Sequence, residues 1–135
     1  MSDRHLASAH LSSGTAKYEQ HIRVRGHELI ADEPAAQGGA DAGASPYGLL
    51  ASALAACTSI TLRMYADRKG WTLGHLDVDV SIDRTDAGDS EVITRTLRFA
   101  PEVTAEQCAR YAEIAEKTPV TKTIRRGTPI TTVIA

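Results

Sequence analysis

Cys57 has the side chain with the clearest potential for chemistry in this chain. It stands in a stretch, Leu49 to Cys57, that carries no charged residue. A cysteine thiolate is a nucleophile and can be oxidised and reduced. A free cysteine among apolar residues is, however, also an ordinary packing residue. The setting alone therefore leaves a reactive thiol and an inert one both open.

The other groups that could do chemistry show weaker patterns. The five histidines have no metal-ligand spacing, so we expect no metal site and no cofactor. The glycine-rich loop at 38–43 lacks the Gly-Lys-Ser/Thr ending of a phosphate-binding loop, and conformational need explains it better. Cys108 is expected to pack in the core, and Arg125 with Arg126 to lie on a solvated loop. Asp32 and Glu33 either steady an active-site arginine or end a strand with Pro34.

The length, the net charge and the cysteine count indicate a single cytoplasmic domain. The 135 residues suffice for one core, and we expect a flexible arm at 1–14 followed by a domain at 15–135. A net charge of -2 gives no reason to expect nucleic acid or a membrane surface as partner. Two cysteines are too few for a secreted disulfide scaffold, and no apolar leader follows the first methionine.

A long helix must position Cys57. Ser45 is a good N-cap, Pro46 suits the first helical position, and Gly70 suits the C-terminal cap. The first half of this helix is apolar on every side, so it must be buried on every side. Its apolar part is too short, and too soon followed by charges, to cross a membrane.

Strands and a second helix surround this helix in the order expected of an α+β protein. Alternating patterns predict strands at 15–24, 28–31, 76–83 and 92–99, a helix that follows Thr104, and a last strand at 130–134. Hairpins separated by helices favour two small antiparallel sheets around the central helix. Two such sheets have too few apolar faces to cover this helix, so we expect a dimer in which a second copy helps to bury it.

Several motifs of the chain resemble those of the OsmC/Ohr family, and its OsmC-like branch in particular. They are Asp32-Glu33-Pro34, Gly38-Gly39, Ser45-Pro46-Tyr47, Ala55-Ala56-Cys57-Thr58, the run from Arg63 to Gly70, and Thr118-Pro119-Val120. The resemblance implies the OsmC-like fold, an intertwined homodimer, and reduction of organic hydroperoxides by a cysteine at the subunit interface.

Under this resemblance, Cys57 matches the family's peroxidatic cysteine. An arginine from the N-terminal region would hold its thiolate, and Arg23 and Arg25 are candidates, with Arg63 and His27 as alternatives. Two positions depart from the family pattern. Tyr47 follows Pro46 where a glutamate is usual, and Thr118 stands where the resolving cysteine precedes Pro-Val.

The resulting hypothesis is a homodimeric peroxidase that reduces a small hydrophobic peroxide through Cys57. Because a hydroxyl forms no disulfide and Cys108 lies ten residues earlier on a helix, an external thiol would resolve the oxidised cysteine. The alternative is a non-enzymatic dimer that binds a small hydrophobic ligand in its interface pocket. A purely structural dimer is the third hypothesis.

Overall fold

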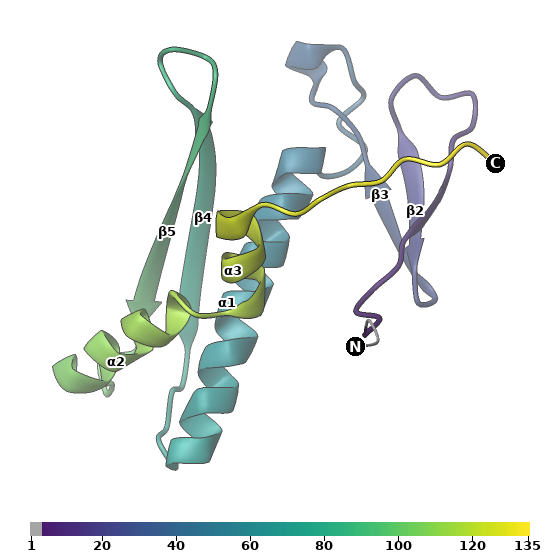
Figure 1. Cartoon of the computed structure of the whole chain (residues 1–135). Helices are drawn as coiled ribbons and strands as arrows, with labels where there is room; N and C mark the ends of the chain where they lie inside the picture. The colour runs from purple at the N-terminus through teal and green to yellow at the C-terminus, as the bar shows by residue number, and fades with distance from the viewer. Residues whose placement is uncertain (1–3) are drawn as a thin grey trace. The chain divides into compact units, whose positions relative to one another are not determined.

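The computed structural model describes residues 4–135, which divide into two compact units at the start of one long helix, α1 (Figure 1). One unit runs up to Leu50 and the other from Ala51 onward. Helices and two small antiparallel sheets occur as the sequence predicts, so the α+β class is confirmed. The single domain over residues 15–135 stays a prediction.

The N-terminal unit is built on a three-stranded antiparallel sheet. Its strands are β1 (His10–Ser12), β2 (Gln20–Val24) and β3 (His27–Ala31), in the order β1-β2-β3. β2 is shorter than the predicted strand at 15–24, because its last pair with β3 joins Gln20 to Ala31. β1 lies within residues 1–14, where the sequence shows no strand pattern; whether this arm is flexible stays a prediction.

A loop held by Asp32 leads from β3 through a short 3-10 helix, η1 (Ala35–Gln37), to α1. The Asp32 carboxylate accepts hydrogen bonds from the backbone N–H groups of Glu33, Ala40 and Ala42, at 2.7, 3.2 and 3.1 Å. A Cβ at Gly39 would lie 1.9 Å from a backbone oxygen of the same loop. The glycines therefore serve close backbone approach, as predicted.

The helix α1 (Pro46–Lys69) has the predicted bounds. Ser45 accepts a hydrogen bond from the Gly48 N–H at 3.0 Å, as an N-cap does, and Gly70 follows at a positive φ of 69°. Its length and apolar character would suit a membrane span. Leu54, Leu62 and Ala66 are buried along it, whereas Leu50, Ile60 and Met64 are exposed in the single chain, so burial of the helix on every side stays a prediction.

The C-terminal unit contains the main apolar core of the described residues. The strands β4 (Leu76–Arg84) and β5 (Glu91–Phe99) form a hairpin in the predicted places, with Val78 opposite Leu97. The helix α2 (Ala105–Ala115) follows Thr104 as predicted, and a capping box of Thr104 and Gln107 begins it. The buried core residues come from α1, α2 and the connecting segments, and they are Leu62, Tyr65, Ala66, Tyr111, Leu73 and Val103. Leu76, Leu97 and Phe99 of the hairpin pack against them. Four aromatic rings line this core, those of Tyr65, Trp71, Phe99 and Tyr111.

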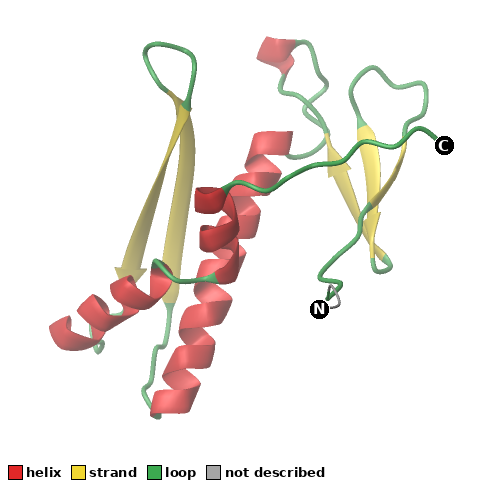
Figure 2. Ribbon diagram, viewed as in Figure 1, coloured by secondary structure: helices red, strands yellow, loops and turns green. Residues whose placement is uncertain are grey.

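Two predictions for the C-terminal segment are wrong. Residues 119–126 form a third helix, α3 (Pro119–Arg126), so Arg125 and Arg126 lie in its last turn and not on a loop. Residues 130–134 form no strand and run as an irregular segment to the C-terminus (Figure 2). A strand exists only where it is paired, and no described strand pairs with this segment.

Candidate functional site

Cys57 lies near the middle of α1 with a half-buried, free thiol. Its sulfur is 4.0 Å from the hydroxyl oxygen of Thr61, one turn further along the helix. Cys108, on α2, is also free and packs against the apolar core, as predicted. The described residues contain no group of three side chains that could hold a metal ion.

Thr58, the residue after Cys57, is fully buried and faces a polar network. Its hydroxyl donates to the Leu54 carbonyl oxygen at 2.7 Å, within α1. The Thr58 hydroxyl oxygen in turn accepts a hydrogen bond from Nη1 of Arg95 on β5, at 3.0 Å. The helix turn that carries the thiol is thus tied to the hairpin by a charge-assisted hydrogen bond.

Arg95 is the centre of this network, and its side chain is only 11% exposed. Besides Thr58, its Nη1 donates to the Thr121 hydroxyl on α3 at 2.9 Å. Its Nη2 donates to the Glu116 carboxylate at 3.0 Å. A buried guanidinium is tolerated only when it is paired and hydrogen-bonded, and these three contacts meet that requirement. Arg95 therefore joins α1, β5 and α3.

Thr118, which the resemblance would place at a resolving-cysteine position, is fully buried and has a structural role. Its hydroxyl accepts from the Thr121 N–H at 3.2 Å, which makes it the N-cap of α3. The hydroxyls of Thr118 and Thr121 are 2.6 Å apart, and Thr121 donates to the Ala115 carbonyl at 3.2 Å. Because the Thr121 hydroxyl donates its one proton to the Ala115 carbonyl oxygen, the Thr118 hydroxyl is the donor in the bond between the two hydroxyls.

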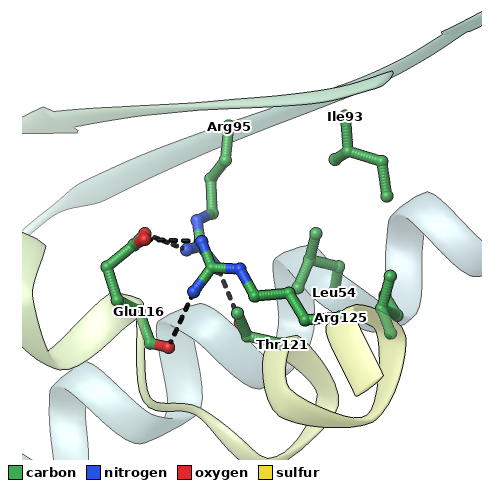
Figure 3. Close-up of a pocket in the computed structure, with 7 residues that line it drawn as sticks. Leu54, Ile93, Arg95, Glu116, Thr121 and Arg125 are labelled. Carbon is green, nitrogen blue, oxygen red and sulfur yellow. Dashed lines mark hydrogen bonds and ion pairs between the residues drawn. The ribbon is translucent and has the colours of Figure 1, made fainter. Parts of the chain in front are cut away.

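A cavity of about 210 Å³ opens beside Arg95 (Figure 3). It is lined by Leu54, Ile93, Arg95, Glu116, Thr121, Ile124 and Arg125. Glu116 accepts from Arg125 at 2.5 Å through one carboxylate oxygen and from Arg95 through the other. The hydrogen bond from Arg125, reinforced by Arg95, lowers the pKa of Glu116 below its ordinary value, against the opposing effect of desolvation. Glu116 is therefore an anion at neutral pH.

Sequence reasoning did not identify Arg95 as a site residue. The sequence did contain a signal for it. Arg95 alternates along β5 in phase with Ile93, Leu97 and Phe99, whose side chains face inward. A charged residue in phase with an apolar face marks a buried polar contact.

The two arginines expected to activate Cys57 lie in the N-terminal unit. Arg23, on β2, pairs with Glu28 at 3.3 Å, and its side chain is 65% exposed. Arg25 occupies the turn between β2 and β3 at a positive φ of 51°. Among the alternatives, His27 begins β3 and Arg63 lies on α1, both exposed. The pairing of any of these with Cys57 stays a prediction.

Comparison with known proteins identifies the fold. Residues 38–133 match the family model described as OsmC-like protein. An OsmC-like protein of Mycoplasma pneumoniae is 17% identical, with a TM-score of 0.72 over 93% of this chain and 89% of its own. An organic hydroperoxide resistance protein of Elizabethkingia anophelis is 23% identical, with a TM-score of 0.68 over 93% of this chain and 91% of its own.

The organic hydroperoxide resistance protein OhrB of Bacillus subtilis has the same fold. It is 23% identical, with a TM-score of 0.63 over 90% of this chain and 91% of its own. No match was found among curated proteins. Since the family model covers most of the chain, including both α1 with Cys57 and the Thr118 turn, this chain belongs to the OsmC-like protein family.

Proposed function

We propose that this protein reduces organic hydroperoxides with the thiol of Cys57, as a cytoplasmic homodimer. The observation that supports this most directly is a free, half-buried cysteine on the central helix of an OsmC-like chain. Several proteins with this fold are named organic hydroperoxide resistance proteins.

The reaction needs one cysteine and two external thiols. The Cys57 thiolate attacks one oxygen of the hydroperoxide, the O–O bond breaks, and the departing alkoxide takes a proton to become an alcohol. Cys57 is thereby oxidised to a sulfenic acid. A first external thiol displaces water to form a mixed disulfide, and a second one releases Cys57 as a thiol. Arg23 or Arg25 would supply the positive charge that stabilises the thiolate.

The positions of the other candidate groups support an external reductant. Thr118 has no sulfur, and its hydroxyl is committed to capping α3. Cys108 packs in the core beside Tyr111. Thr118 therefore supplies no second thiol, and the Cys108 thiol is engaged in core packing on α2.

Exposed apolar side chains support the proposed homodimer. On α1, Ile60 and Met64 are 54% and 59% exposed in the single chain. In the C-terminal segment, Ile130, Val133 and Ile134 are at least 81% exposed. Burying such groups against a second copy is favourable, at about 25 cal/mol per Å² of apolar surface. Sedimentation equilibrium should therefore give twice the monomer mass of 14.4 kDa.

Sulfenate trapping tests the peroxidase directly. Reduced protein is mixed with cumene hydroperoxide and a sulfenate-specific probe, and the modified cysteine is located by mass spectrometry. We expect rapid trapping at Cys57 that is lost in Cys57→Ala and retained in the control Cys108→Ala. Slow trapping shared equally by the two cysteines would refute the proposal.

A ligand-binding protein without redox activity is the second candidate. The observation that favours it is the cavity beside Arg95, together with Thr118 in place of a resolving cysteine. This candidate predicts no peroxide-dependent change at Cys57 and measurable binding of a small organic molecule by the oxidised and reduced protein alike.

A further inference from the structure

We propose that the cavity beside Arg95 binds a small organic carboxylate with a short apolar chain. This inference goes beyond the peroxidase and does not depend on it, because Cys57 is not among the lining residues. It rests on the charges, the hydrogen bonds and the size of the cavity.

The charges that line the cavity leave one positive charge in excess. Arg95 and Arg125 are both cations, and the lining contains one carboxylate, that of Glu116. The two guanidinium groups share it, one on each oxygen (Figure 3). A second anion in the cavity would therefore meet a net positive charge in a partly desolvated site, where Coulomb attraction is stronger than in water.

Both guanidinium groups retain N–H donors for such an anion. Of the five N–H groups of Arg95, three go to Thr58, Thr121 and Glu116 within the described part of the chain. Arg125 uses two, both toward Glu116. Guanidinium N–H groups suit the two oxygens of a carboxylate, and such hydrogen bonds are about twice as strong as neutral ones.

The remaining lining selects an organic anion over an inorganic one. Leu54, Ile93 and Ile124 provide apolar side chains from α1, β5 and α3. The cavity has a volume of about 210 Å³. Pockets for drug-sized ligands have volumes of about 300 Å³ or more, so this cavity suits a smaller molecule. A branched acid of a few carbons matches both features, and isovalerate is the probe that we choose.

Calorimetric titration with isovalerate tests the assignment, with isovaleramide as its uncharged counterpart and inorganic phosphate as an anion without an apolar part. We expect isovalerate to bind at least about tenfold more tightly than either, the difference that one charge-assisted hydrogen bond supplies. Equal affinity of the amide would refute the role of the charge. Equal affinity of phosphate would refute the organic ligand, and no binding of isovalerate would refute the site.

Two variants of lining residues, each judged against a variant outside the lining, locate the binding. Arg125→Gln removes one exposed guanidinium and should weaken isovalerate binding about tenfold, whereas the neighbouring Arg126→Gln, outside the lining, should leave it unchanged. Glu116→Gln removes the competing carboxylate and should strengthen binding. Weaker isovalerate binding in Glu116→Gln, or a loss in Arg126→Gln as large as that in Arg125→Gln, would overturn the proposal. Cys57→Ala should bind isovalerate normally, so failure of the peroxidase proposal would leave this one standing.

Discussion

The two units of the chain bury polar groups in different ways. In the C-terminal unit, Arg95 is enclosed by side chains from α1, α3 and Glu116, next to an apolar core around Tyr111. In the N-terminal unit, only Ala31 and Asp32 are buried among residues 4–50. Asp32 is held by backbone N–H groups of its own loop.

This difference indicates where the stability of the chain is determined. The C-terminal unit buries large side chains, and burial of apolar surface is the main favourable term in folding. The N-terminal sheet leaves Leu29 and Ile30 more than 40% exposed. A sheet of this size needs a packed apolar face for independent stability. We infer that the C-terminal unit sets the free energy of unfolding, whereas the N-terminal unit relies on local hydrogen bonds and on the proposed second copy.

The largest effect is expected from Tyr111→Ala. Tyr111 is fully buried against Phe99, Tyr65 and Trp71, so its truncation should cost about 4 kcal/mol of the free energy of unfolding, measured by urea denaturation. Tyr111→Phe is the matched control. Among the described residues no group bonds its hydroxyl, so removing that hydroxyl should cost nothing or stabilise slightly. A large loss in Tyr111→Phe would contradict the packing account.

A smaller effect is expected from Arg95→Met. The methionine keeps most of the volume but loses the hydrogen bonds to Thr58, Thr121 and Glu116, at a cost of about 2 kcal/mol. Arg98→Met is the control, since Arg98 lies on the same strand with a 60% exposed side chain and pairs with Asp79. It should change stability by less than about 0.5 kcal/mol. Equal losses in the two variants would mean that Arg95 is no more important than a surface arginine.

The sequence predicted those elements whose pattern is local. The bounds of α1 followed from Ser45, Pro46 and Gly70, and the hairpin from strict alternation. The helix α3 was not predicted, although Thr118-Pro119 is a typical helix start. The prediction of a strand at 130–134 was wrong, because a strand needs a neighbouring strand to pair with. The residue pattern of one segment does not show whether such a neighbour exists.

The candidate site was only partly predictable for a similar reason. Cys57 stood out through its charge-free surroundings, and the family resemblance gave it a role. Arg95 and Glu116 meet across residues far apart in the sequence. No spacing rule connects a strand residue with the residue after a helix, so only the fold could reveal this pair and the cavity beside it.

The smallest effect is expected in the N-terminal unit, from Asp32→Asn. The backbone N–H of Ala42, with those of Glu33 and Ala40, holds the pKa of Asp32 below its ordinary value, against desolvation. The ionised form is therefore the one that orders the loop. Its contribution is complete above about pH 4, where Asp32 is ionised even in the unfolded chain, and is lost as the pH falls through the lower folded-state pKa.

Amide hydrogen exchange at neutral pH measures this local effect. In Asp32→Asn the amides of Ala40 and Ala42 should exchange several times faster, while the global unfolding transition moves little, because the loop lies outside the apolar core of the C-terminal unit. Glu33→Gln is the control, since its side chain accepts none of these hydrogen bonds. A global loss of stability in Asp32→Asn as large as that in Arg95→Met would overturn the contrast between the units. It would mean that the loop ordered by Asp32 supports the whole fold, and not only the entry to α1.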